Sequence, residues 1–168
     1  MRARGKEKWE VAEKVSAAVR TGELWEAVKI VENFISTEKI GREDLKGIYV
    51  EADKKENTLI LRTSDLKMSA KVEIAGQINE NGRAVVSCKI FKDLIKGISD
   101  AGVNIAIEEE KMLIQTVNSK STISLIEDVE LTVWSKVDSS RYYSVQKSEL
   151  KSLLENVKFS ASANPENE

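Results

Sequence analysis

Two segments of the chain show the same order of polar and apolar positions. Val19–Leu24 and Val145–Leu150 each pass from a strand-type valine, through a three-residue break, to Glu-Leu. Apolar residues at helical spacing follow in both, as far as Phe34 in the first and Phe159 in the second. The segments lie 126 residues apart, about the size of an ordinary domain. The pattern predicts an array of duplicated units, with one full unit and the opening of a second.

Hydrophobic periodicity predicts the order of elements in the first unit. Val15–Arg20 alternates as a strand does, and Thr21 is the expected N-cap of a helix over Glu23–Ser36. Three strands follow; then a short strand, a second helix over Lys89–Ser99 and three further strands repeat the order. The expected strands after the first helix are Leu45–Glu51, Thr58–Thr63, Met68–Gly76, Ala84–Val86, Asn104–Glu108, Met112–Thr116 and Thr122–Leu125. A βαβββ unit that occurs twice makes one α+β domain with antiparallel sheets and both helices on one side.

Helical angles place the apolar and basic residues of the second helix on opposite faces. The apolar face is Ile90, Phe91, Leu94, Ile95 and Ile98. The basic face is Lys89, Lys92 and Lys96, within roughly 60° of one another, with Asp93 at its edge. Phe91 and Leu94 are therefore expected in the core, and Lys92 in solvent.

The first and third predicted helices also carry lysines, next to acidic residues. In the third helix the lysines lie within roughly 40° of one another, and they are Lys147, Lys151 and Lys158. The first helix carries Lys29 on an outer face that Glu26 and Asn33 make nearly neutral. Each cluster alone is typical of a solvated helix face. Two basic faces on repeat-related helices indicate a surface that follows phosphates without reading bases.

Composition removes several classes of function. The 168 residues carry a net charge of −2, so a nucleic-acid contact has to come from a local patch. Histidine is absent and Cys88 is the one cysteine, which leaves no disulfide framework and favours a reducing, cytoplasmic compartment. No apolar run approaches the length of a membrane span.

Motifs of catalysis are also missing from the sequence. There is no phosphate-binding glycine loop and no serine elbow. Glu108–Glu110 is interpreted as a solvated turn between two strands, in preference to an acidic metal cluster. The sequence predicts a protein that is not an enzyme and that has no metal site and no cofactor.

Several stretches in succession resemble the bacterial sliding clamp, the beta subunit of DNA polymerase III. Asn57–Met68 is similar to the family's strand-turn-strand T-L-x-L-x-[AG]-T-D-L-E-M, with Ser64 at the usual threonine. Val86–Gly97 resembles the helix V-P-A-[RK]-x-[LF]-x-D-I-[LIVC]-[RK]-G, with Ser87 in place of proline. Lys111–Ile114 together with Ser119–Leu125 resembles the hairpin that follows.

Further resemblance extends this match toward the end of the chain. Tyr142–Ser162 resembles the start of the family's second domain, so that the likeness runs from about Lys14 onward. The D-F-P that usually follows the first domain is replaced by Val129–Trp134, which marks a divergent member.

The resemblance implies both a fold and a function. Sliding clamps form a ring of repeated domains, with sheets outside and two helices per domain on the inner face, around duplex DNA. The ring holds the polymerase to its template without reading sequence. The residues that the resemblance would turn toward DNA are Lys29, Lys89, Lys92, Lys96, Lys147, Lys151 and Lys158. The DNA polymerase and the clamp loader would be partners of the full-length protein.

The expected organisation has three parts. Residues 1–14 form a charged N-terminal extension, 15–138 the clamp N-terminal domain and 139–168 a truncated start of the second domain. Such a fragment is expected not to close a ring, because the remaining domains supply the ring contacts. The main alternative is a clamp-like protein-interaction module that does not bind DNA. Salt separates the two, since contacts of lysines with phosphates weaken steeply as salt rises. An enzyme of unknown type is a third, less favoured reading.

Overall fold

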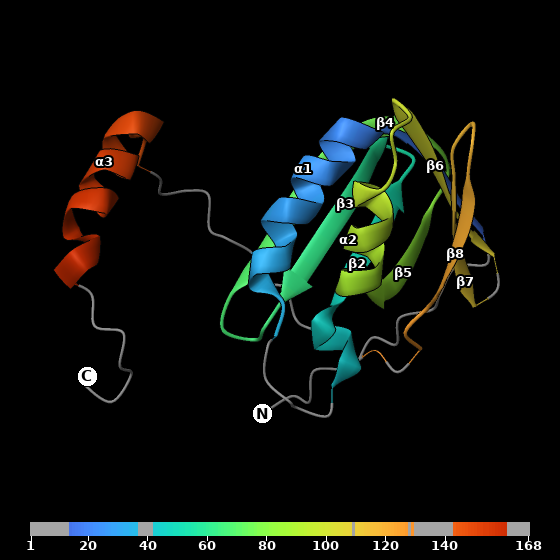
Figure 1. Ribbon diagram of the computed structural model, residues 1–168, viewed down its shortest axis with the longest axis horizontal. Helices are drawn as coiled ribbons and strands as arrows, with labels where there is room; N and C mark the ends of the chain where they lie inside the picture. Colours follow the sequence, from blue (N-terminus) through green and yellow to red (C-terminus); the bar gives the residue numbers. More distant parts are fainter. Residues whose placement is uncertain (1–13, 37–41, 109, 128, 130–142, 161–168) are drawn as a thin grey trace. The chain divides into compact units, whose positions relative to one another are not determined.

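The computed structural model describes residues 14–36, 42–108, 110–127, 129 and 143–160 (Figure 1). By internal contacts the chain divides into two units, 1–134 and 135–168. The predicted extension 1–14 falls outside the described residues, apart from Lys14, which is the first residue of a strand. No helix in the described ranges is long and apolar enough to cross a membrane.

The first unit has the predicted order of elements, a βαβββ pattern that occurs twice. Its first half is β1 (Lys14–Arg20), α1 (Thr21–Val31), β2 (Gly47–Asp53), β3 (Thr58–Ser64) and β4 (Ser69–Glu80). Its second half is β5 (Gly82–Ser87), α2 (Cys88–Lys96), β6 (Gly102–Glu108), β7 (Lys111–Gln115) and β8 (Lys120–Ser124). Short 3-10 turns η1 (Glu32–Phe34) and η2 (Glu43–Lys46) lie between α1 and β2. The predicted fold class is confirmed.

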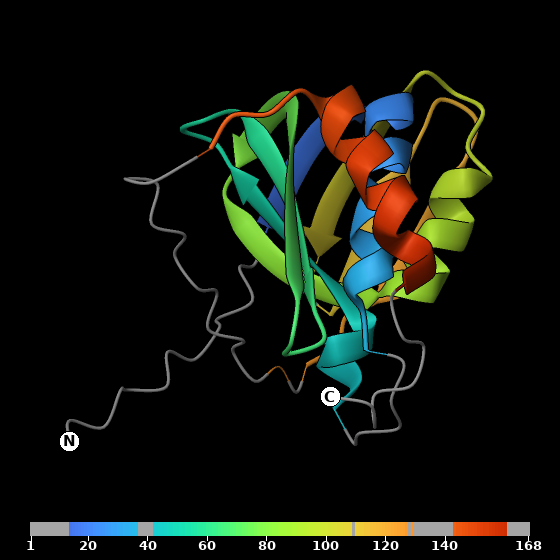
Figure 2. The ribbon, with the colours of Figure 1, turned by 90° about the vertical axis from the view of Figure 1, so that its left-hand side faces the viewer.

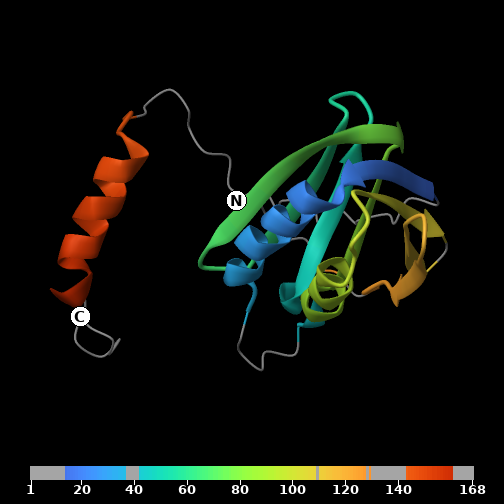
Figure 3. The same ribbon diagram turned by 45° about the horizontal axis from the view of Figure 1, so that its top comes forward.

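All eight strands form one antiparallel sheet in the order β5-β2-β3-β4-β1-β6-β7-β8. The long strand β4 joins the two halves, because its first part pairs with β3 and its last part with β1 (Figure 3). The two edge strands, β5 and β8, are also linked. Val86 of β5 forms a β-bridge with Leu125, just after β8, and the Ile126 N–H donates to the Val85 carbonyl at 2.8 Å. The helices therefore pack on a sheet whose two edges are joined by backbone hydrogen bonds.

Both helices of the first unit lie side by side on the same face of the sheet (Figures 1 and 2). α1 packs mainly on β3 and β4, and α2 on β2, β5 and β8. The core between helices and sheet contains Leu24, Val28 and Val31 of α1 together with Phe91 and Ile95 of α2, all at most 1% exposed. Alternating strand residues such as Leu59, Leu61, Ile105 and Met112 close it from below. The predicted helix placement is confirmed.

Three details of the predicted helices are wrong. The N-cap of α1 is Arg20, and Thr21 is already a buried residue of the first turn. Both helices are shorter than predicted, since α1 gives way to a 3-10 turn after Val31 and α2 ends at Lys96. Ile90 is 50% exposed, because the buried face of α2 is centred on Cys88, Phe91 and Ile95, and Ile90 points about 140° away from it.

The predicted strand over Leu45–Glu51 begins two residues later, at Gly47, because η2 comes first. Asp44 in η2 is 1% exposed and accepts hydrogen bonds from the Arg42 guanidinium at 3.1 and 2.5 Å and from the Tyr49 hydroxyl at 3.0 Å. These bonds hold the turn against β2. A Cβ on Gly47 would lie 2.7 Å from Cγ1 of Val85, so the turn needs glycine where β2 approaches β5.

The described part of the second unit contains α3 (Lys147–Val157) and η3 (Lys158–Ser160). Each boundary of these elements lies 126 residues after the matching boundary of α1 and η1. The N-caps also correspond, since Arg20 and Gln146 share an extended backbone with ψ of 129°. The repeat predicted from the sequence is confirmed in local structure.

Candidate nucleic-acid interface

The candidate interface is the solvent side of the layer formed by α1 and α2. Each helix follows its strand without a loop, because Arg20 ends β1 and Ser87 ends β5. The Thr21 N–H donates to the Ala101 carbonyl at 3.0 Å and fixes the start of α1. The sheet thus sets the position of both helices and of the charges they carry.

Lys89 and Lys96 are the exposed lysines of α2, and Asp93 lies between them in the helix. Among the residues that the structure describes, neither ammonium group has an ion-pair partner within 4.0 Å. Their separation of seven residues places them within about 20° of each other around the helix and about 10 Å apart along it. They form a pair of cations on one flank of α2.

Lys92 differs from these two lysines. Its Nζ lies 2.5 Å from Oε2 of Glu32 in η1, and the two side chains are 37% and 24% exposed. The hydrogen bond to Glu32 raises the pKa of Lys92, so the ammonium stays charged. The structure therefore brings Lys92 to the junction of the two helices.

Lys29 lies on the outer side of α1 with its charge partly compensated. Its Nζ is 2.6 Å from Oε1 of Glu26 and 5.7 Å from the ring centroid of Trp25. Arg20, at the start of the same helix, pairs with Glu23 at 3.3 Å. The nearly neutral outer face predicted for this helix agrees with these pairs.

Side chains of both charges therefore lie on the helical layer. The lysines are Lys29, Lys89, Lys92 and Lys96, and the carboxylates are Glu23, Glu26, Glu32 and Asp93. On such a surface Lys89 and Lys96 are the lysines left available to an anion, and the mixture of charges gives little long-range attraction. It suits a weak contact that does not depend on sequence.

The lysines of the second unit have a different setting. Every described side chain of α3 is exposed, and Lys151 is paired loosely with Glu155 at 3.8 Å. Lys147, Lys151 and Lys158 border a shallow apolar groove that Leu150, Leu154 and Val157 line. The basic face of α3 is thus continuous with its apolar face.

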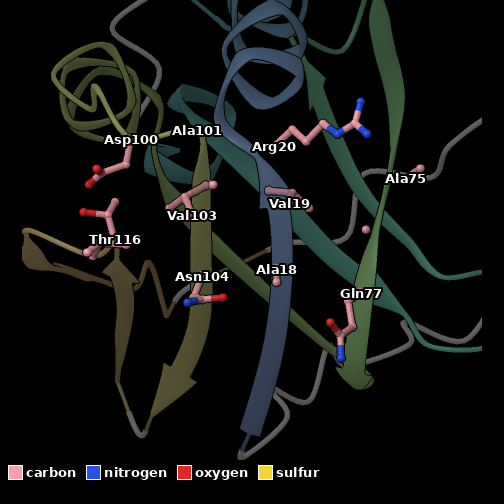
Figure 4. A pocket seen from close by; sticks show the side chains of 13 residues that line it. Ala18, Val19, Arg20, Ala75, Gln77, Asp100, Ala101, Val103, Asn104 and Thr116 are labelled. Carbon is pink, nitrogen blue, oxygen red and sulfur yellow. The ribbon is translucent and has the colours of Figure 1, made fainter.

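A broad depression lies on the opposite face of the sheet, over β1, β4 and β6 (Figure 4). Ala18 forms its floor, and its cross-strand neighbours Gln77 and Asn104 flank it. At one edge Asp100 accepts a hydrogen bond from the Asn118 side chain at 2.9 Å. Within the described residues, no group of three or more His, Cys, Asp or Glu is placed to hold a metal ion, and Glu109 lies outside them. The lining offers no pairing of a nucleophile with a base.

Sequence reasoning located the lysines and the Glu26 partner of Lys29, but it missed the residue that restrains Lys92. Glu32 and Lys92 are sixty positions apart in the chain, and no local pattern connects them. The Lys29–Glu26 pair has a local signal, since residues three apart are neighbours on a helix.

Comparison with known proteins places the fold in a family. The model of the DNA polymerase III beta subunit, N-terminal domain, matches residues 16–132. None of the curated proteins matches the sequence.

Solved structures with the same fold come from several bacteria. The DNA polymerase III beta subunit of Thermotoga maritima is 20% identical with a TM-score of 0.79, over 90% of this chain and 41% of that one. The sliding clamp of Bacillus subtilis is 17% identical with a TM-score of 0.81, over 91% and 42%. A Helicobacter pylori beta clamp bound to a DNA ligase peptide is 19% identical with a TM-score of 0.65, over 73% and 34%. This chain spans about two fifths or less of their length.

Proposed function

The chain belongs to the family of the DNA polymerase III beta subunit through its N-terminal domain, and we therefore propose that it works as part of a sliding clamp. In this proposal residues 15–138 are the first clamp domain and 139–168 begin the second. The protein is a non-catalytic processivity factor that keeps a polymerase on duplex DNA in the cytoplasm. Polymerase, clamp loader and ring formation belong to the longer protein.

The observation that carries the proposal is the helical layer of a matched clamp domain. α1 and α2 cover one face of the sheet (Figure 2). Lys89 and Lys96 are exposed residues of α2 and have no ion-pair partners among the described residues. Lys29 and Lys92 lie on the same layer. In this proposal the second unit adds Lys147 and Lys151 of α3 and Lys158 of η3. Lysines that meet phosphates across a surface of mixed charge give a contact that slides.

Salt-dependent binding tests this function. The full chain is titrated onto a labelled duplex and onto a second duplex of scrambled sequence, between about 50 and 200 mM salt. We expect equal affinities for both duplexes. We also expect log K to fall linearly with log salt, and the magnitude of this salt slope should decrease by about 0.9 for each phosphate contact removed. Lys89→Gln and Lys96→Gln should each lower the slope. Lys54→Gln, an equal charge change in an exposed turn between strands, should leave it unchanged.

One observation favours the alternative function of a protein-interaction module. The four carboxylates of the helical layer offset most of the positive charge of its four lysines and Arg20, and Ile90 is 50% exposed on this layer. A docking protein would bind such a surface with little dependence on salt. If the chain does not bind duplex even at low salt, the clamp function is excluded for this chain and the protein-interaction module is the function that is left.

A further inference from the structure

The ion pair of Lys92 with Glu32 is unlike the other ion pairs of the helical layer. Lys29–Glu26 and Arg20–Glu23 each join residues three apart at α1, and their members are 40–82% exposed. Lys92–Glu32 instead joins α2 to the turn that follows α1, at 2.5 Å, with members 37% and 24% exposed. Less exposed pairs are screened less by salt, so this contact persists where the others weaken.

The geometry of α2 separates Lys92 from its neighbours. Lys89 and Lys96 project in nearly the same direction, whereas Lys92 is turned by about 60° from Lys89 and about 40° from Lys96, to the side where Glu32 binds it. A phosphate that approaches Lys92 would meet the carboxylate of Glu32 at the same place. Contact with Lys92 would require the pair to open.

We infer that Glu32 is a positioning residue of the DNA-facing layer, which holds the Lys92 ammonium between α1 and α2 and leaves Lys89 and Lys96 to contact phosphate. This inference rests on the proposed function. It limits the DNA contact of α2, whose three lysines are all described, to two charges. It also gives Lys92 a role in fixing the distance between the helices.

The repeat supports a specific role for Glu32. The residue 126 positions later, at the first position of η3, is Lys158. The same place in the repeat thus carries a carboxylate in the first unit and a lysine in the second. A carboxylate here is not required by the local fold, since the 3-10 turn forms with either residue.

Four variants test the inference by their effect on the salt slope of duplex binding. Lys92→Gln should leave the slope unchanged, whereas Lys89→Gln should lower it by about 0.9. Glu32→Gln should raise the slope by up to about 0.9, because it releases a lysine to the phosphates. Glu43→Gln, whose carboxylate pairs with Lys46 in η2, is the matched control and should have no effect. A loss of slope in Lys92→Gln equal to that in Lys89→Gln would overturn the inference, as would an unchanged slope in Glu32→Gln.

The thiol of Cys88 gives a readout that needs no DNA. The charges of Glu32 and Lys92 act on its pKa in opposite directions, Glu32 raising it and Lys92 lowering it. The titration followed by the Cys88 ¹³Cβ shift should therefore move down in Glu32→Gln and up in Lys92→Gln. If wild type fails to bind duplex while these shifts occur, the proposed function fails and the ion pair stands. If wild type binds and the slopes contradict the expectation, the inference alone fails.

Discussion

The hydroxyl of Thr63 in β3 donates a hydrogen bond to the main-chain carbonyl of Val31, the last residue of α1, at 2.7 Å. Both residues are 0% exposed. The last carbonyls of a helix have no partner within it, and inside a core they need one from elsewhere. Thr63 supplies that partner for α1 and fixes the helix end beside the turn that carries Glu32.

Removal of this hydroxyl should destabilise the domain. Thr63→Val keeps the size of the side chain but leaves the buried Val31 carbonyl without a donor, which costs about 1–3 kcal/mol. Thr58→Val makes the same change at a half-buried position of the same strand and should alter stability by about 0.5 kcal/mol or less. Urea unfolding of both variants measures the difference. Equal losses in the two would show that the hydrogen bond contributes nothing.

Truncations of neighbouring residues test the orientation of α2. Phe91 is 0% exposed, so Phe91→Ala should lower the free energy of unfolding by about 3–5 kcal/mol. Ile90 is 50% exposed, and Ile90→Ala should cost about 1 kcal/mol or less. Denaturant titration compares the two. A larger loss at Ile90 would contradict the helix orientation.

The order of elements followed from the sequence because each strand and helix carries its own period. The alternation of β6, the short apolar runs of β2, β3, β5 and β7 and the apolar spacing of α1 need no tertiary information. The orientation of α2 did not follow fully, because five apolar residues in a short helix fit more than one face. Packing decides in favour of Cys88, Phe91 and Ile95, and only the sheet beneath them makes that choice.

The candidate interface was predictable to a smaller extent. The helical angles placed Lys89, Lys92 and Lys96 on one face of the second helix. They could not show that Glu32, sixty residues earlier in the chain, pairs with Lys92. η2 was missed for a different reason. Arg42 and Tyr49, two and five residues from Asp44, hold its carboxylate, and such hydrogen bonds leave no apolar period in the sequence.

The turn between β3 and β4 should depend on pH through Asp65. The N–H groups of Met68, above all, and of Lys67 donate to its Oδ1 at 2.6 and 2.9 Å and lower the pKa of Asp65 below its ordinary 3.8. The charged carboxylate therefore contributes stability that is complete above pH 3.8 and is lost as pH falls through the lower folded value. A carboxyl ¹³C titration should give a pKa below 3.8, and the stability gap to Asp65→Ala should narrow in acid.

Alkaline pH should weaken the domain through Cys88. Burial, and next the charge of Glu32, raise the pKa of this thiol from 9.0 to about 11. Because the folded state favours the neutral thiol, its contribution is complete below pH 9.0 and is lost as pH rises toward about 11. Urea unfolding of wild type and Cys88→Ala from neutral pH to pH 11 measures the effect. The difference between the two proteins should shrink as pH rises, and a constant difference would contradict the prediction.

The last prediction compares α3 with α2 by hydrogen exchange. α3 has 11 residues and none is buried, whereas α2 has 9 residues and buries Cys88, Phe91 and Ile95. Isolated helices of this length are marginal in water, since nucleation is costly and packing supplies most of the stability. Neither helix has a side-chain cap, so burial is the main difference between them.

The amides of Leu150–Val157 should therefore exchange far faster than those of Phe91–Ile95 in a dilute solution of the full chain, although α3 is the longer helix. The apolar side chains of α3 are 45–60% exposed at Leu150, Leu153, Leu154 and Val157. Contact of this surface with a second copy would slow the exchange as concentration rises. Exchange at several protein concentrations separates fraying from association. If α3 is protected as strongly as α2 at high dilution, contacts within one chain stabilise the helix, and its leucines are buried in solution.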